Sequence, residues 1–222
     1  MRLVIGKVLQ PAQLDEIRGL LDRAAFEDGR RTAGAAARRV KNNLQLAPDS
    51  EAYRRASEIV RAALDANEAF QAAALPRAMS APLFARYEAG MGYGAHVDNA
   101  LMRGPDLRTD LAFTLFLAEP GDYEGGELVL QEAEGENSIK LAAGDLFLYP
   151  ATTVHRVEAV RSGRRDVCVG WVQSLVRDPR VREMAFDMAR TKQLLGSEGP
   201  GAETLELVSK TLSNLLRLHI EP

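Results

Sequence analysis

The spacing of apolar residues predicts helices at both ends of the chain. Apolar side chains recur at helical intervals after Pro11, a residue that suits a first helical turn. A second stripe of this kind follows Asp49 and Ser50, either of which can cap the start of a helix. Residues 181–196 and 202–219 repeat the pattern. The sequence therefore places helices before and after a middle region of a different kind.

The middle region has the shorter alternation of β-strands, with glycine and proline marking the turns. We expect an opening strand at 2–9 and further strands at 82–89, 110–118, 127–131, 139–141, 145–149, 154–160 and 167–173. So many short strands indicate a closed or two-sheet β structure. Residues 27–50 are rich in glycine, alanine and arginine, and we expect a loop with short elements there.

Composition narrows the classes of function. The 222 residues carry a formal net charge of −3, whereas a nucleic-acid partner would favour a basic face. The longest apolar runs fall far short of the roughly 20 residues needed to cross a bilayer, so no membrane partner is expected. One cysteine cannot form an internal disulfide, and the N-terminal apolar run is broken too early for a signal peptide. We therefore expect a cytoplasmic protein.

Two of the three histidines fit a metal site. His96 and Asp98 are two residues apart, so in an extended segment they face one side and can reach one ion. His155, near the start of a predicted strand, offers a third ligand. Two histidines and one carboxylate leave positions open on the metal, which is the arrangement of non-haem iron oxygenases. His219, close to the end of the chain, is assigned a structural or inert role.

Three further residues suit such a site. Arg165, at the start of the next strand, can hold a carboxylate through two hydrogen bonds. Trp171 has the same strand parity and would face the same way, and Tyr87 can donate a hydrogen bond to a co-substrate. Each has a plain alternative: a surface arginine, a core tryptophan and a core tyrosine.

Six segments carry a family resemblance. The segment Arg86–Asn99 contains a His-x-Asp motif, and Tyr123–Leu128 contains a double-glycine turn. The segment Gly144–Val157 contains a Tyr-Pro pair followed by a histidine. Together they resemble the iron(II)/2-oxoglutarate dioxygenase superfamily, in its prolyl-4-hydroxylase-like branch. The other three are most similar to the PKHD-type hydroxylases (YbiX/PiuC) of that branch: Lys41–Leu46, Asp110–Leu117 and Trp171–Asp178.

The resemblance implies a fold and a domain plan. The fold is α+β or mainly β, with a double-stranded β-helix (jelly-roll) core, N-terminal helices packed on it and C-terminal helices. Residues 1–177 would form the dioxygenase domain, with a helical part at 1–78 and a β core at 79–177. Residues 178–222 would form a C-terminal helical extension, whose apolar stripes could pair two copies into a homodimer.

The resemblance also implies an activity. Fe(II) would be held by His96, Asp98 and His155, and 2-oxoglutarate by Arg165, with O₂ as oxidant and ascorbate (vitamin C) as a candidate reductant. The reaction would hydroxylate a peptide or small molecule, in a role linked to iron or siderophore metabolism, and release succinate and CO₂. The rival hypotheses are a non-catalytic module on the same barrel, binding a metal or small acid, and a cupin-like enzyme. Arg165 speaks against the cupin, and the histidines are too few for one.

The expected pocket wall comprises Trp171, Phe116 and Asn99. Phe116 stands where the better-known prolyl hydroxylases often carry a tyrosine on the central strand, and it cannot donate a hydrogen bond. Residues 99–109 are expected to form a mobile flap over the substrate.

Overall fold

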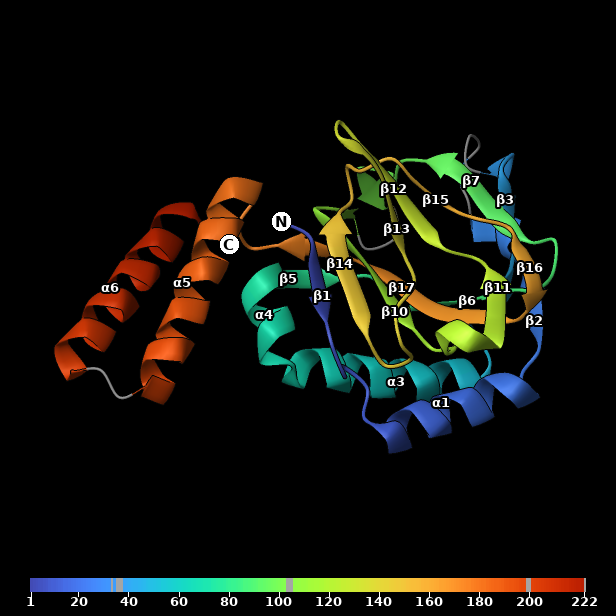
Figure 1. Ribbon diagram of the computed structural model, residues 1–222, viewed down its shortest axis with the longest axis horizontal. Helices are drawn as coiled ribbons and strands as arrows, with labels where there is room; N and C mark the ends of the chain where they lie inside the picture. The colour runs from blue at the N-terminus through green and yellow to red at the C-terminus, as the bar shows by residue number, and fades with distance from the viewer. Residues whose placement is uncertain (33, 35–37, 103–105, 199–200, 222) are drawn as a thin grey trace.

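Two antiparallel β-sheets packed face to face form the centre of the computed structural model, which describes residues 1–32, 34, 38–102, 106–198 and 201–221. Helices lie beneath the larger sheet, and the last two helices stand together at one end (Figure 1). The mixed α and β architecture with a two-sheet core confirms the fold class expected from the sequence.

The larger sheet runs in the order β1 (Leu3–Ile5), β14 (Leu146–Pro150), β10 (Leu111–Phe116), β17 (Arg165–Ser174), β6 (Leu83–Tyr87), β4 (Leu44–Leu46) and β2 (Phe26–Asp28), and β5 (Pro76–Met79) also pairs with β17. The smaller sheet runs β13 (Gly135–Ile139), β12 (Leu128–Glu132), β15 (His155–Val157), β7 (Gly92–His96) and β3 (Lys41–Asn42). Two short ribbons pair β11 (Tyr123–Gly125) with β16 (Val160–Gly163), and β8 (Leu101–Met102) with β9 (Leu107–Arg108).

The helices are α1 (Pro11–Arg23), α3 (Glu51–Ala66), α4 (Glu68–Ala74), α5 (Pro179–Glu198) and α6 (Ala202–His219), with short 3₁₀ turns at Gly29–Thr32 and Pro120–Asp122. Helices α1 and α3 run under the larger sheet, and α5 packs against α4 and α6 (Figure 1). No helix among the described residues is long and apolar enough to span a bilayer.

Strand β10 shows why the middle of the chain is so apolar. Leu111, Phe113 and Leu115 belong to the cluster that packs against the helices, while Ala112 and Phe116 belong to the cluster between the sheets. Both faces of the strand are therefore buried, and its apolar run is continuous instead of alternating. Strand β10 pairs along its length with β17, in which Val169, Trp171 and Gln173 are only half-buried.

Several boundaries differ from the prediction. The strand predicted at 154–160 is two strands, β15 and β16, which belong to different sheets. Residues Gly92–His96, outside the strand ranges expected from the sequence, form strand β7, where a Cβ atom at Gly92 would lie 3.0 Å from the Val157 carbonyl oxygen. Strand β13 was predicted too late in the chain because its side chains are mostly exposed and polar. The opening strand is confined to Leu3–Ile5.

Ser50 caps helix α3: its hydroxyl accepts a hydrogen bond from the Tyr53 backbone N–H at 3.1 Å. We expect Ser50→Ala to lower the free energy of unfolding by about 1 kcal/mol, because one N–H of the first turn loses its acceptor. Asp49→Ala is the matched control, since among the described residues Asp49 accepts a hydrogen bond from Arg54 through its backbone oxygen, which the substitution keeps. Urea denaturation measures both variants, and a larger loss for Asp49→Ala would contradict the assignment.

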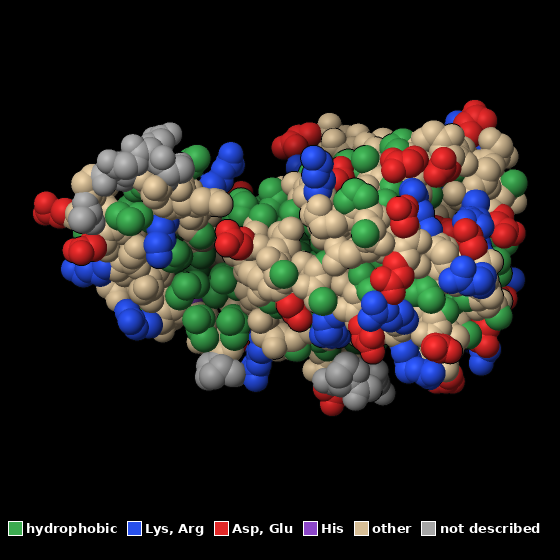
Figure 2. Space-filling view, turned by 90° about the horizontal axis from the view of Figure 1, so that it is seen from below, with side chains coloured by type: hydrophobic (Ala, Val, Ile, Leu, Met, Phe, Trp, Pro, Cys, Tyr) green, Lys and Arg blue, Asp and Glu red, His purple; other side chains and the backbone are tan. Residues whose placement is uncertain are grey.

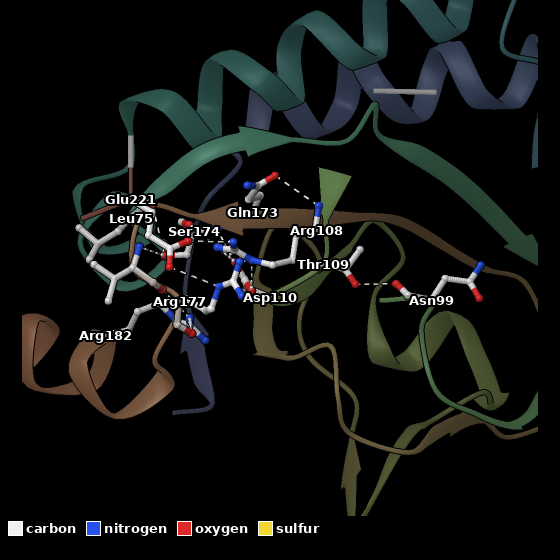
Figure 3. A network of polar contacts seen from close by, with 11 residues as sticks. Leu75, Asn99, Arg108, Thr109, Asp110, Gln173, Ser174, Arg177, Arg182 and Glu221 are labelled. Atoms are coloured by element: carbon white, nitrogen blue, oxygen red, sulfur yellow. Dashed lines mark hydrogen bonds and ion pairs between the residues drawn. The ribbon is translucent and has the colours of Figure 1, made fainter. Parts of the chain in front are cut away.

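The chain after α6 is bonded back to the β core (Figure 3). The Glu221 carboxylate pairs with Arg108 of β9 at 3.1 Å and with Arg177 at 3.3 Å. Its backbone N–H donates to the Leu175 carbonyl at 2.9 Å. Arg108 also holds Asp110 through both carboxylate oxygens. The domain boundary at residue 177 stays a prediction, but the extension beyond it is tied to the core at both ends.

Candidate active site

His96 and His155 are brought together by strand register. Strands β7 and β15 are antiparallel neighbours, and His96 is the cross-strand partner of His155, with ring centroids 4.3 Å apart. Asp98 follows just beyond the end of β7. One ligand atom from each of the three residues lies within 4.8 Å of the other two. The structure therefore gathers the three predicted ligands at one point, close enough to share one metal ion.

The two imidazoles are oriented by backbone carbonyls. Nδ1 of His96 lies 2.9 Å from the Gly94 oxygen, and Nδ1 of His155 lies 3.0 Å from the Thr153 oxygen. A carbonyl can only accept, so each Nδ1 carries the proton and each Nε2 keeps its lone pair. Metal-binding histidines are fixed by this kind of contact.

The electrostatics of the cluster fit a bound cation. Burial, and then His155, lower the pKa of His96 to about 4, so this imidazole is neutral and able to ligate. Burial raises the pKa of Asp98, against smaller opposing effects from His155 and Trp171. The Asp98 Oδ2 atom is buried and has no hydrogen bond of normal geometry with the described residues. A buried carboxylate oxygen without a partner is costly, and a metal ion would satisfy it.

Arg165 is a buried cation that needs an anion. Its side chain is 1% exposed, and its Nε and Nη1 atoms have no hydrogen-bond acceptor of normal geometry among the described residues. The guanidinium carbon lies 5.0 Å from the ring centre of Tyr87 and 5.6 Å from that of Phe116. Aromatic rings stabilise the cation only in part. A carboxylate from a bound dicarboxylic acid would supply the missing acceptors.

The double-glycine turn shapes the space around Arg165. Gly126 has a φ of +68°, and a Cβ atom there would lie 3.0 Å from the Arg165 Cδ and 3.1 Å from the Tyr123 ring. Glycine is therefore required twice, for its backbone angle and for the close approach. The Tyr123 hydroxyl is buried beside Arg165, whose charge opposes the rise in the Tyr123 pKa that burial causes.

A cavity of about 280 Å³ between the sheets contains this chemistry. Its wall includes most of the predicted residues, namely His96, Asp98, His155, Arg165, Tyr87, Trp171 and Asn99. Phe116 is the exception, because it is fully buried behind Arg165 and does not line the cavity. Its ring centre lies 5.6 Å from the guanidinium carbon of Arg165, and its place in the pocket wall stays a prediction. Arg165 reaches the cavity from the larger sheet and His155 from the smaller one.

The sequence interpretation gave no role to two aromatic residues of the site. Tyr93 stacks on His96 with ring centres 3.7 Å apart, and Tyr149 meets His155 edge-on at 5.3 Å. Both line the cavity. Both stand inside the motifs that carry the family resemblance, and Tyr93 could have been assigned once Gly92–His96 was recognised as a strand.

The flap expected at 99–109 is partly described. Strands β8 and β9 pair as a ribbon, and Thr109 Oγ1 donates to the Asn99 carbonyl at 2.5 Å. Asn99 and Met102 line the cavity, so this segment lies at its wall. Residues 103–105, in the middle of the expected flap, lie outside the described residues. Its mobility stays a prediction.

The chain is similar to known oxygenases in sequence and in fold. Residues 82–173, which contain the three clustered side chains and Arg165, match the model of the 2OG-Fe(II) oxygenase superfamily. Similar folds include a prolyl-4-hydroxylase from Pseudomonas putida, with 22% identity, 78% of this chain and 92% of that chain covered, and a TM-score of 0.51. The α-ketoglutarate-dependent carbocyclase SnoK from nogalamycin biosynthesis is 16% identical in sequence. The match covers 79% of this chain and 80% of the SnoK chain, with a TM-score of 0.58. These structures support the fold alone.

Relatives with similarity over the whole chain define a narrower family within this superfamily. A PKHD-type hydroxylase from Synechococcus sp. (strain JA-2-3B'a(2-13)) is 49% identical over 219 residues, 98% of each chain. Another, from Rippkaea orientalis, is 46% identical over the same share. The chain belongs to the PKHD-type hydroxylases, and it is an enzyme of the 2-oxoglutarate and iron(II)-dependent oxygenases.

Proposed function

We propose that this protein hydroxylates its substrate with Fe(II) held by His96, Asp98 and His155, and with 2-oxoglutarate held by Arg165. The observation that carries the proposal is a pair of features in one cavity: a His-Asp-His cluster, and a buried arginine. Among the described residues, Asp98 Oδ2 and the Nε and Nη1 atoms of Arg165 have no hydrogen-bond partner of normal geometry. A metal and a dicarboxylate co-substrate satisfy both. When bound, iron and O₂ couple hydroxylation to the breakdown of 2-oxoglutarate into succinate and CO₂.

The protein's own residues bind and orient the reactants. His96 and His155, through their Nε2 atoms, and Asp98, through its carboxylate, would hold the metal. The Arg165 guanidinium fixes the far carboxylate of 2-oxoglutarate. The Tyr87 side chain is buried beside it, and we assign its hydroxyl to the same carboxylate. Trp171 and Asn99 line the same cavity, and we assign them to the wall on the substrate side.

The substrate is proposed to be small, or to enter by one small group of a peptide. The cavity of about 280 Å³ is at the lower limit of ordinary ligand pockets and must also contain 2-oxoglutarate. A peptide or a siderophore-related molecule from iron metabolism meets this limit if only its tip enters. The cytoplasmic location and ascorbate as reductant are part of the same proposal, and the single buried thiol, Cys168, agrees with a reducing compartment.

A mass screen tests the proposal. We expect a metabolite or peptide to gain one oxygen, and 2-oxoglutarate to be converted to succinate in equal amount, only when Fe(II) and O₂ are present. Succinate formation coupled to product is measured by mass spectrometry with ¹⁸O₂ to trace the oxygen. A protein that binds Fe(II) and 2-oxoglutarate tightly but never turns over the co-substrate would be the non-catalytic binding module instead.

We also propose a homodimer formed through the C-terminal helices. Leu207 and Leu218 on α6 are 60% and 79% exposed, and Met184 on α5 is half exposed. Figure 2 shows apolar side chains on these helices and where they meet the rest of the protein. Light scattering at micromolar concentration should give twice the chain mass, and Leu207→Glu with Leu218→Glu should halve it. A monomeric mass for the unaltered protein would reject the dimer.

A further inference from the structure

The two histidines of the metal cluster differ from Asp98 in what holds them in place. The Gly94 oxygen orients His96 and the Thr153 oxygen orients His155, each from two residues away. Asp98 follows the end of β7, and its Oδ2 atom has no hydrogen-bond partner of normal geometry among the described residues. A carboxylate that ligates a metal is normally hydrogen-bonded itself. Asp98 therefore needs a donor from another part of the fold.

Trp171 carries a buried donor in the same cavity. Its indole Nε1 atom is buried and has no acceptor of normal geometry in the part of the chain that the structure describes. Trp171 and Asp98 both line the cavity. Burial raises the pKa of Asp98, and His155 and then the Trp171 indole oppose that rise, so the indole lies close to the carboxylate. An indole N–H only donates and an ionised carboxylate only accepts, so the two groups are complementary.

The position of the indole is fixed through the backbone of Trp171 in β17. The Ser80 N–H donates to the Trp171 carbonyl at 2.9 Å, and the Ser80 Oγ accepts from the Trp171 N–H at 3.1 Å. The cross-strand partner on β10 is Ala112, whose side chain is small. Arg165 lies six residues earlier in β17 and also lines the cavity. One strand of the larger sheet therefore presents both the buried arginine and the indole to the space between the sheets.

We propose that Trp171 is a positioning residue of the metal centre, whose Nε1–H donates to one oxygen of Asp98 and directs the other oxygen to the metal. This inference rests on the proposed function, in which Asp98 is a metal ligand. The oxygen bonded to the indole is withheld from the metal, so the carboxylate occupies one coordination position and not two. More positions are then left for the co-substrate. The contact also joins the two sheets, because β17 and β7 belong to different ones.

The chain has one tryptophan, so its N–H can be removed with little change of shape. Expression with β-(3-benzothienyl)alanine in place of tryptophan gives a ring of similar outline whose sulfur does not donate. Ni(II) is the probe, because it binds such ligands more tightly than Fe(II). We expect its dissociation constant, measured by calorimetry on the untagged full-length protein, to rise at least about tenfold. The Tm of the metal-free protein should stay the same, because the shape of the ring is kept.

Protein made with 5-fluorotryptophan is the matched control, because this analogue keeps the N–H, and it should bind Ni(II) as the unaltered protein does. The Asp98→Ala background separates positioning from a general effect on the cavity wall. In that background, loss of the N–H should weaken Ni(II) binding no further, because Trp171 acts through Asp98. Full Ni(II) affinity without the N–H, an equal loss with 5-fluorotryptophan, or the same loss in Asp98→Ala would each overturn the inference.

Failure of the proposed function gives a different result. If the unaltered protein bound no Ni(II), or if His155→Ala bound it equally well, the metal site itself would be wrong. Ni(II) binding that depends on His155 and Asp98 but not on the indole N–H would leave the metal site in place and overturn the role of Trp171 alone.

Discussion

Replacing His155 with alanine is expected to leave the protein folded but without iron and without turnover of 2-oxoglutarate. His155 is one of only two imidazoles in the cluster, and its Nε2 lone pair has no substitute among the described residues around it. Altering a residue that merely orients a ligand costs about 10–100-fold in metal affinity, so losing the ligand itself should cost more. The fold should survive, because the His155 side chain hydrogen-bonds to a carbonyl only two residues away, that of Thr153, and so does not link distant parts of the chain.

Metal content after Fe(II) loading and succinate formation from 2-oxoglutarate measure this effect. His219→Ala is the control, because His219 is exposed on α6, far along the chain from the cluster. It should keep full metal content and turnover. Iron retained at one ion per chain in His155→Ala, or lost equally in His219→Ala, would remove His155 from the ligand set.

The candidate site was largely predictable because its key residues obey strand periodicity. His96 and Asp98 share a face two residues apart, and Arg165 and Trp171 share one six residues apart. All four line the cavity. Periodicity does not say which sheet a strand joins. Strand β16 pairs with β11, and β17, which carries Arg165, lies in the opposite sheet from His155.

The position of Lys41 in the cavity wall could not be predicted from the sequence pattern. Strands β3 and β4 have two and three residues, too few for a period to be visible. They exist because each pairs with a longer strand, β7 or β6. The segment was thus expected to be a loop with short elements, which was correct, but its place in the cavity could not follow from local pattern. Phe116 is the opposite case. Strand alternation predicts that its side chain points into the space between the sheets, but not that it is fully buried next to Arg165.

Replacing Arg165 with methionine should abolish 2-oxoglutarate binding and leave the metal in place. Arg165 is the cation nearest the proposed far carboxylate, and a charge-assisted pair in a buried cavity is worth far more than a surface one. We expect the dissociation constant of 2-oxoglutarate to rise at least about 100-fold. The free energy of unfolding without 2-oxoglutarate should not fall. The variant removes a buried cation whose Nε and Nη1 atoms have no acceptor among the described residues, and it leaves an apolar side chain near Tyr87 and Phe116.

Thermal unfolding with and without 2-oxoglutarate separates these two effects. A ligand at 100 times its dissociation constant stabilises the folded state by about 2.7 kcal/mol, so 2-oxoglutarate should raise the Tm of the metal-loaded protein and not that of Arg165→Met. Arg164→Met is the control, because the guanidinium of Arg164, next to Arg165 in the sequence, is partly exposed and pairs with Asp22 at 2.6 Å. It should keep the 2-oxoglutarate response. If 2-oxoglutarate raised the Tm of Arg165→Met as much as that of the unaltered protein, Arg165 would not be the residue that binds the co-substrate. The proposal that the cavity binds a dicarboxylate through Arg165 would then be wrong.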